Sequence, residues 1–301
     1  MALGKDQWTI LVACHQDSNA PLLNSPYKEV CVLQGESKPA GYDHYVLREN
    51  RTLIYPETWS EIEVFLDSKS FFEVSNLVGL QHYRRIFSLG NDDLEAVMHM
   101  RISQRNHFAA IQIEHLSKYK NEIIIPRKWK FAYSAWDQFI DCKPELEEIF
   151  TFGLNELDLL LSSYFGVVNS KAILQESFYL YPLNMFIGSI EFFIEWHEIL
   201  SKLVGKIEGA APQFENSLTP RWGGFLAERF FSVYITLCQE RNRWAFVEKS
   251  VAIFDLEDEK NDYQDLIQQH QDLIQQHQAV LNSRIWKATK PLRSIVKFVK
   301  N

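Results

Sequence analysis

The sequence predicts an α/β protein in which a mostly parallel sheet is flanked by helices and followed by a C-terminal helical, coiled-coil extension. Apolar, β-branched runs of strand length alternate with longer stretches of helical periodicity, which is the pattern of such a sheet. Polar side chains follow two of these runs, at the strand ends where α/β sheets bind ligands. Near the C-terminus a seven-residue unit occurs twice in succession, which predicts the extension.

Length and charge divide the chain into three parts. Its 301 residues have room for one large α/β domain with an appendage, or for two modest domains. We expect the α/β domain to cover residues 1–250, and an acidic stretch with a short heptad segment to cover residues 251–283. A basic amphipathic tail would then cover residues 284–301.

Composition excludes several classes of protein. The net charge of -8 argues against a nucleic-acid binder, which needs a basic surface. The four cysteines show no CxxC pair and no metal-ligand spacing, which predicts reduced thiols in the cytoplasm. The N-terminus lacks the apolar core of a signal peptide, and the most apolar later stretch, Phe178 to Trp196, is interrupted by proline and glutamates. We therefore expect no membrane span.

In the first part of the chain, two buried strands stand on either side of a helix. Trp8 to Cys14 (WTILVAC) predicts the first strand. Residues 18–51 are rich in proline and glycine and predict loops, with a short strand near Glu29 to Leu33. Thr58 to Asp67 carries apolar residues at helical spacing and predicts a helix that leads into the second buried strand, Phe71 to Leu80.

The middle of the chain is predicted to be largely helical. Asp92 to His115 has helical spacing with mixed faces, and Glu122 to Pro126 is a short β-branched run that a proline ends. Trp136 to Phe165 predicts a long helix with Gly166 as its stop.

The remainder of the domain predicts a strand, a helix, a loop and a further helix. Met185 to Ile190 predicts a strand that runs directly into a helix. Gly205 to Pro220 is rich in Gly, Pro, Asn and Ser, which predicts a loop able to cover a site. Arg221 to Gln239 predicts a helix whose start is hinged by two glycines.

A compact cluster of His82, Tyr83, Arg84 and Arg85 directly follows the second buried strand. Two guanidinium groups beside an imidazole can grip a diphosphate or another dianion through charge-assisted hydrogen bonds. The alternative is a solvated basic turn. His15 follows the first strand in the same way and is either a second ligand-binding group or a structural histidine.

The C-terminal extension combines a heptad repeat with a basic tail. The unit DLIQQHQ occurs twice between Asp265 and Gln278, and placing Ile267 and Ile274 at the a positions puts a histidine at each following d position. We expect a weak coiled coil over residues 263–281 that joins a second copy or a partner, with an isolated helix as the alternative. Residues 284–301 hold six basic residues and no acidic one, which predicts an amphipathic helix on anionic lipid or, alternatively, docking on an acidic patch.

Four segments carry a resemblance to a known family: ILVACHQ from Ile10, GLQHYRRIF from Gly79, LNMFIGS from Leu183 and GGFLAERF from Gly223. In this order they resemble bacterial capsule and O-antigen biosynthesis proteins, formerly a domain of unknown function and now regarded as glycosyltransferases similar to the GT-A fold. The landmarks that match residue by residue are His82 to Arg85, Asn184 to Ile187 and Gly224 to Arg229. The tail (SRIWKATKPLR) resembles endings that follow coiled coils in polysaccharide-assembly enzymes. One departure is that residues 136–166 lack a histidine that family members often carry there.

The resemblance implies a GT-A-like sheet and transfer of a sugar from a nucleotide sugar to a glycan acceptor. We expect the acceptor to be lipid-linked and the protein to lie in the cytoplasm, peripherally on the inner face of the cell membrane. The alternatives are a non-catalytic scaffold of a polysaccharide-synthesis complex and, less favoured, a phosphoryl or phosphoglycosyl transferase that uses the same anion cluster.

Such a transfer must stabilise the charge of a departing nucleoside diphosphate. Many transferases do so with Asp-x-Asp and a divalent metal, but the nearest match here, Asn91 to Asp93, is better explained as a helix N-cap. We therefore expect no required cofactor, with Mg²⁺ or Mn²⁺ left open, and expect His82, Tyr83, Arg84 and Arg85 to bind the diphosphate directly.

An inverting transferase also needs a carboxylate base. Glu228 is the first candidate because it pairs in sequence with Arg229, although a structural Glu-Arg pair is an equal alternative. Asp137 and Asp141 are the next candidates. Asn184 would bond a sugar or ribose hydroxyl, or act as a buried cap, and His15 would lie at the nucleotide end.

Overall fold

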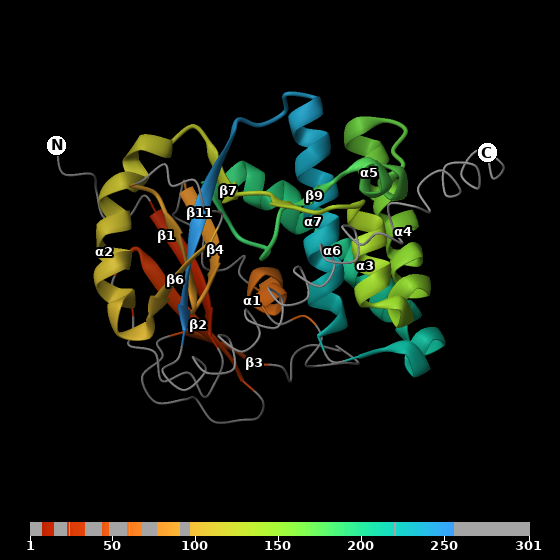
Figure 1. Ribbon diagram of the computed structural model, residues 1–301, viewed down its shortest axis with the longest axis horizontal. Coiled ribbons are helices and arrows are strands. Elements are labelled where there is room, and N and C mark those ends of the chain that lie inside the picture. The colour runs from red at the N-terminus through yellow and green to blue at the C-terminus, as the bar shows by residue number, and fades with distance from the viewer. Residues whose placement is uncertain are drawn as a thin grey trace, which may run out of the picture. The chain divides into compact units, whose positions relative to one another are not determined.

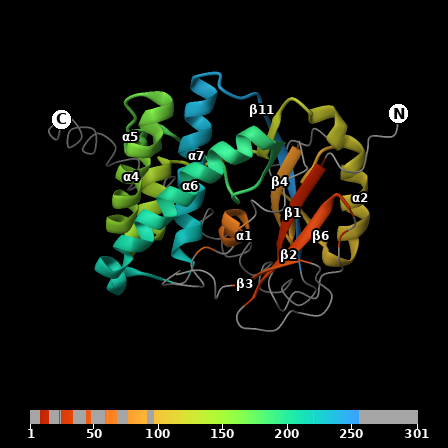
Figure 2. The ribbon, with the colours of Figure 1, turned by 180° about the vertical axis from the view of Figure 1, so that it is seen from behind.

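A computed structural model describes residues 8–14, 23, 25–33, 44–47, 59, 61–67, 77–90, 97–219 and 221–255 of the protein. The described residues up to Phe254 belong to one compact unit. A nine-stranded sheet lies between helix α2 on one side and the other helices, α1 and α3 to α7, on the opposite side (Figures 1 and 2). His15, residues 91–93 and residues 256–301, with the predicted heptads and tail, lie outside the described residues.

The described residues form eleven strands and seven α-helices. The large sheet contains β1 (Trp8–Cys14), β2 (Tyr27–Leu33), β3 (His44–Leu47), β4 (Leu77–His82), β5 (Arg85–Ser88), β6 (Val97–Arg101), β7 (Ile123–Pro126), β10 (Phe186–Ser189) and β11 (Phe246–Asp255). A separate two-stranded ribbon contains β8 (Trp129–Lys130) and β9 (Tyr179–Leu180). The α-helices are α1 (Glu61–Asp67), α2 (Arg105–Leu116), α3 (Ala135–Cys142), α4 (Glu147–Phe165), α5 (Ser170–Glu176), α6 (Ile190–Ala210) and α7 (Trp222–Glu240).

The sheet is mixed rather than mostly parallel. Strands β3, β2, β1 and β4 run parallel to one another, as the sequence predicts. Strand β10 then inserts antiparallel between β4 and β7, and β11 runs parallel to β7 before it pairs antiparallel with β5. Because β5 follows β4 through a tight turn, the strands β4, β10, β7, β11 and β5 form a closed circuit of pairings.

The larger hydrophobic core lies between the sheet and the six helices of the helical layer. Phe186 of β10 packs edge-on against Phe65 of α1 and Phe192 of α6, with ring centroids 5.9 and 5.3 Å away. Close approach of α4 to α7 depends on Gly153, where a Cβ would lie 2.7 Å from Cζ of Phe230. These aromatic contacts pack the helical layer against the sheet.

Helix α2 covers the opposite face and is joined to the sheet by a buried ion pair. Nη2 of Arg105 donates a hydrogen bond to Oε1 of Glu29 on β2, and the side chains are 0% and 6% exposed. Burial raises the pKa of Glu29 in spite of the opposing charge of Arg105. This ion pair links helix α2 to strand β2, and breaking a buried ion pair by removal of one partner is costly to stability.

Several predicted elements are confirmed. Strand β1 has the predicted bounds, and the run at Glu122 to Pro126 forms β7. Of the strand predicted over Phe71 to Leu80, residues 77–80 lie in β4, which continues to His82, and residues 71–76 lie outside the described residues. Gly166 ends α4 with a φ of 79°, a conformation that glycine adopts readily.

Three expectations are wrong. Gly205 to Pro220 is not a loop, because α6 continues to Ala210 and a 3-10 helix follows over Ala211–Ser217. Buried side chains such as Leu203 and Ile207 pack α6 against the core. The stretch Asp92 to His115 contains strand β6, which pairs with β11, before α2 begins. The helix expected over Trp136 to Phe165 is two helices, separated by a 3-10 turn at Pro144–Leu146 where proline interrupts the backbone hydrogen bonding.

No helix within the described ranges combines the length and the hydropathy needed to cross a membrane.

Gly79 on β4 is predicted to be intolerant of a side chain. A Cβ there would lie 2.8 Å from Cγ1 of Ile187 and 3.0 Å from the carbonyl oxygen of Phe186, both on the neighbouring β10. We expect Gly79→Ala to lower the free energy of unfolding by about 1–3 kcal/mol, measured by chemical denaturation. The matched control is Gly205→Ala in α6, where nothing lies within 4 Å of the added carbon, so the protein should gain about 0.5–1 kcal/mol. Equal stability of the two variants would contradict the close β4–β10 packing.

Candidate functional site

One edge of the sheet carries the hairpin residues His82 to Arg85 and the start of strand β10. Ala13 near the end of β1 pairs with His82 at the end of β4, and β10 pairs with β4 in the register Phe186 to Leu80. Because β10 is antiparallel to β4, it begins at the edge where β4 ends. Asn184 lies in the turn two residues before β10, and therefore near the edge where β4 ends. The topology thus brings residues about one hundred positions apart in sequence to one strand-end edge, where open α/β sheets bind their ligands.

The cluster from His82 to Arg85 is the tip of a tight hairpin between β4 and β5. His82 pairs with Arg85, so Tyr83 and Arg84 form the turn. The amide of Tyr83 donates to the carbonyl oxygen of Ala13 at 2.9 Å, and the amide of Phe254 donates to the carbonyl oxygen of Arg84 at 2.8 Å. The tip is therefore held from both sides, by β1 and by β11, and its side chains are presented from a fixed backbone.

Within the hairpin tip, the aromatic groups are buried and the cations are partly exposed. His82 and Tyr83 are 4% and 7% exposed, with ring centroids 4.5 Å apart. Nδ1 of His82 accepts a hydrogen bond from the amide of Arg84 at 3.3 Å. The guanidinium of Arg84 lies 5.6 Å from the centre of the Tyr83 ring. Arg84 and Arg85 are half-buried, so the tip offers two guanidinium groups at one turn.

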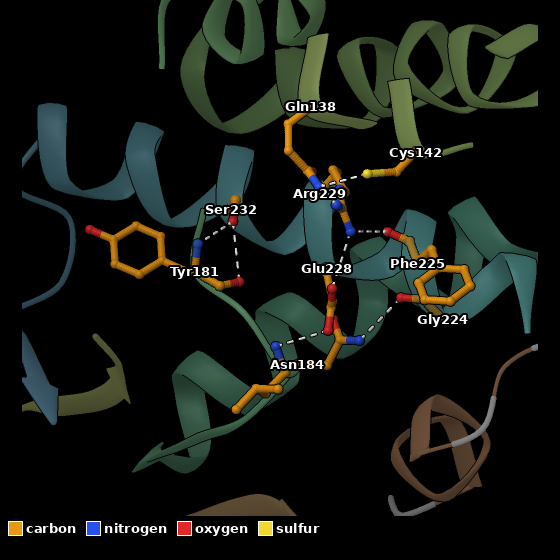
Figure 3. Close-up of polar contacts among 10 residues, drawn as sticks. Gln138, Cys142, Tyr181, Asn184, Gly224, Phe225, Glu228, Arg229 and Ser232 are labelled. Carbon is orange, nitrogen blue, oxygen red and sulfur yellow. Dashed lines mark hydrogen bonds and ion pairs between the residues drawn. The ribbon is translucent and has the colours of Figure 1, made fainter. Parts of the chain in front are cut away.

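The turn before β10 has a strained backbone. Leu183 and Asn184 have φ values of 75° and 49°, in the left-handed region that costs a residue with a side chain about 1–2 kcal/mol. Oε1 of Glu228 accepts a hydrogen bond from the amide of Leu183 at 3.0 Å, and Nδ2 of Asn184 donates to the carbonyl oxygen of Gly224 at 3.3 Å (Figure 3). The N-terminal part of α7 thus fixes the turn.

Arg229 holds Glu228 from the other side. Its Nη1 donates to Oε2 of Glu228 at 3.1 Å and to the carbonyl oxygen of Phe225 at 3.3 Å, and its Nη2 donates to Oε1 of Gln138 at 2.8 Å (Figure 3). The guanidinium also lies 5.0 Å from the ring of Phe139. Burial lowers the pKa of Arg229, an effect that the charge of Glu228 opposes.

The two glycines before Glu228 do not form a flexible hinge. Helix α7 begins at Trp222, so Gly223 and Gly224 lie in its first turn, and Gly223 is buried. The left-handed residue at this point is Arg221, with a φ of 63°, directly before the helix. The backbone that positions Glu228 is therefore helical from its start.

Asp137 lies at the surface near the start of α3. Its Oδ2 accepts a hydrogen bond from Oγ of Ser134 at 2.8 Å, and its amide donates to the same Oγ at 3.0 Å, so the two residues cap the helix. The residue of α3 that reaches Arg229 is its neighbour Gln138, which the sequence analysis missed because a single glutamine in a helix carries no motif. The structure joins Glu228, Arg229 and Asn184 through α7, with Asp137 outside this network.

Within the ranges that the structure describes, no group of three or more His, Cys, Asp or Glu side chains is arranged to hold a metal ion. The two guanidinium groups of the hairpin tip are suited to an anionic ligand.

Removal of the Glu228 carboxylate is expected to destabilise the protein strongly. Glu228→Ala would leave the amide of Leu183 without its acceptor and the buried Arg229 without its charged partner, at a cost of about 3–5 kcal/mol in the free energy of unfolding. Glu228→Gln keeps an acceptor oxygen and should cost clearly less. The control is Glu156→Gln, whose partner Lys206 is exposed, with an effect below about 1 kcal/mol. We call the Glu228–Arg229 pair and its bond to the Leu183 amide the clamp. A Glu228→Ala protein as stable as this control would refute a stabilising role for the clamp.

Comparison with known proteins supports the fold. A solved structure titled "WbbM bifunctional glycosytransferase apo structure" matches with a TM-score of 0.52 and 14% sequence identity. The match covers 83% of this chain but 45% of that protein, so the chain spans less than half of its relative's length. At this identity the likeness establishes a shared mixed α/β architecture. No curated protein matches the sequence significantly.

A family model matches residues 69–241, which is more than half of the 301 residues. The matched range begins before β4 and ends after α7, and therefore contains the hairpin tip, the strained turn and the Glu228–Arg229 pair. The chain belongs to the family described as "Domain of unknown function (DUF4422)".

Proposed function

We propose that the protein is a glycosyltransferase that moves a sugar from a nucleotide-sugar donor to a glycan acceptor in the synthesis of a bacterial surface polysaccharide. The observation that carries the proposal is the convergence of the hairpin tip and the strained turn at one strand-end edge of an α/β sheet. The hairpin tip is cationic, and the carboxylate of Glu228 on α7 binds the amide of Leu183 in the turn, so both chemistries that the reaction requires are represented. The architecture shared with a glycosyltransferase supports this choice.

The hairpin tip would bind the diphosphate of the donor. Breaking the anomeric C–O bond leaves a nucleoside diphosphate whose negative charge grows in the transition state, and fixed cations stabilise that charge. Arg84 and Arg85 supply the charge from a turn that β1 and β11 hold in place, with His82 and Tyr83 packed behind it. Asn184, in the turn before β10, would offer its remaining hydrogen-bonding capacity to a sugar or ribose hydroxyl. His15 would complete the nucleotide end.

Glu228 is proposed as the base that accepts the proton of the acceptor hydroxyl. Its Oε1 accepts a hydrogen bond from the amide of Leu183 and its Oε2 accepts one from Nη1 of Arg229, so the carboxylate is held in a fixed orientation while its side chain is 18% exposed. Arg229 orients the carboxylate rather than contacting the acceptor. Asp137 is the second candidate, and full transfer activity in a folded Glu228→Gln protein would favour it.

A non-catalytic scaffold is the second candidate function. The observation in its favour is that Glu228 and Arg229 are already engaged with each other and with the backbone, as in a purely structural clamp. A scaffold would neither bind nor consume a nucleotide sugar.

Donor binding separates the two functions. A panel of nucleotide sugars, each with and without Mn²⁺ and with EDTA, should contain one that stabilises the full-length protein by about 2.7 kcal/mol when present at 100 times its dissociation constant. The Arg84→Ala, Arg85→Ala double variant should lose this stabilisation, because the cations of the hairpin tip are gone. Arg241→Ala, which removes an exposed arginine after α7, is the control and should retain it. Retained binding and turnover in the double variant would refute the role of the tip.

The tail, residues 284–301, is proposed to hold the protein on the anionic inner face of the cell membrane, near a lipid-linked acceptor. Its six basic residues without an acidic one support this role. The full chain should co-sediment with phosphatidylglycerol vesicles, whereas a chain that ends at Ser283 should remain in the supernatant. Vesicles of phosphatidylcholine, which lack net charge, should bind neither protein. Equal sedimentation of both proteins with the anionic vesicles would exclude the tail as the anchor.

A further inference from the structure

Two exposed aromatic side chains stand out on the described surface. The large hydrophobic side chains that are exposed within the described ranges are Ile111, Tyr133, Leu159, Val167, Phe178 and Ile194. The aromatic members of this set are Tyr133 and Phe178, which are 43% and 56% exposed. Both flank the β8–β9 ribbon, although they are 45 positions apart in the sequence.

The backbone brings the segments that carry these rings together. Trp129 pairs with Leu180 and Lys130 pairs with Tyr179 in the ribbon. Beyond the paired residues, the amide of Phe131 donates to the carbonyl oxygen of Phe178 at 2.9 Å, and the amide of Ala135 donates to the carbonyl oxygen of Ser177 at 2.7 Å. Tyr133 lies between these two bonds on one segment, and Phe178 lies opposite on the other.

The ribbon is anchored to the domain by its buried end. Nζ of Lys128 lies 4.3 Å from the centre of the Tyr179 ring and 5.3 Å from that of Tyr181, and it pairs with Glu248 of β11 at 3.4 Å. The amide of Tyr181 donates to Oγ of Ser232 on α7 at 2.8 Å (Figure 3). A surface held in this way needs little ordering when a ligand binds, which favours affinity.

Both segments lead directly to the candidate site. Tyr181 and Pro182 join β9 to the strained turn at Leu183, where Glu228 binds the backbone. On the other segment, Ser134 begins helix α3, whose Gln138 binds Arg229. Phe178 is thus close in sequence to Leu183, which binds the proposed base, and Tyr133 is close in sequence to Gln138, which binds Arg229 beside that base.

We propose that Tyr133 and Phe178 form a platform on which pyranose rings of the acceptor glycan stack. The inference rests on the proposed function and assigns the acceptor side of the same site. A pyranose presents an apolar C–H face that packs on an aromatic ring, and hydroxyls at its rim that exposed polar groups such as Lys130 can bind. A stacked acceptor chain would extend from the platform toward Glu228.

The size and charge of the platform favour a glycan over other occupants. Two aromatic side chains bury about 150–250 Å² each, below the roughly 800 Å² per partner of a stable protein interface. The exposed charges beside the rings, Lys130 and Glu176, are of opposite sign, which does not favour an anionic membrane surface.

Saccharide binding to the full-length protein tests the platform. The probe is a mixture of α- and β-linked hexose di- and trisaccharides, observed by saturation-transfer difference NMR. We expect saturation to pass from the native protein to the saccharides. The Tyr133→Ala, Phe178→Ala double variant should bind the saccharides at least about fivefold more weakly, because stacking contributes about 1 kcal/mol. Tyr133→Phe with Phe178→Tyr keeps both rings and should retain binding. Leu159→Ala with Val167→Ala, which removes exposed apolar side chains elsewhere, is the matched control.

The outcomes separate this inference from the proposed function. The double alanine variant should keep the thermal stabilisation by the nucleotide-sugar donor, since the hairpin tip is intact, and circular dichroism verifies that it is folded. If the donor binds but the native protein shows no saccharide signal, or the alanine variant shows an unchanged one, the platform is refuted and the proposed function stands. The platform is also refuted if the double alanine variant keeps the saccharide signal but loses binding to phosphatidylglycerol vesicles, or loses a dimer that the native protein forms. If no donor binds, the proposed function itself fails.

Discussion

Strand β4 pairs with β1 on one side and with β10 on the other, and the candidate site depends on this double pairing. The parallel neighbour ends beside the hairpin tip, and the antiparallel neighbour begins there, so two strands of opposite direction present their polar ends at one edge. Gly79 permits the close approach of β10, because a side chain at that position would overlap Ile187 and the backbone of Phe186. A purely parallel sheet would have placed Asn184 at the opposite edge, away from His82.

The clamp of Glu228 and Arg229 explains how the protein tolerates a strained turn. A leucine and an asparagine in left-handed conformation are costly, and they persist where surrounding contacts over-determine them. Here the contacts come from the first two turns of α7, and a glutamine on α3 accepts a further hydrogen bond from Arg229. Pairing the two charges also lowers the cost of burying each of them. If Glu228 is the base, the same hydrogen bonds that relieve the turn would orient the carboxylate for catalysis.

The hairpin tip, the Glu228–Arg229 clamp and the β8–β9 ribbon would divide the proposed reaction among them. The hairpin tip carries positive charge for a diphosphate, the clamp carries a carboxylate for an acceptor hydroxyl, and the ribbon carries exposed rings for the acceptor's sugar units. Each is built on backbone that neighbouring elements hold by hydrogen bonds, which keeps the groups in place without a bound ligand. Such preorganisation is what electrostatic catalysis requires, because fixed charges need no rearrangement when the transition state forms.

The sequence by itself determined the α/β class, the positions of β1, β4 and β7, and the identity of the hairpin cations. Short apolar runs and local charge clusters can be recognised because each is defined by a few neighbouring residues. It also indicated Glu228 and Arg229 as candidate site residues. It misjudged Gly205 to Pro220, where small and polar residues resemble a loop, yet buried Ile207 keeps the chain helical. Only the tertiary structure decided that β10 is antiparallel, that Glu228 binds an amide 45 residues away, that Gln138 reaches Arg229, and that Tyr133 lies near Phe178. These contacts join residues far apart in the chain, so no periodicity or local composition encodes them, and they arise when the helices pack on the sheet.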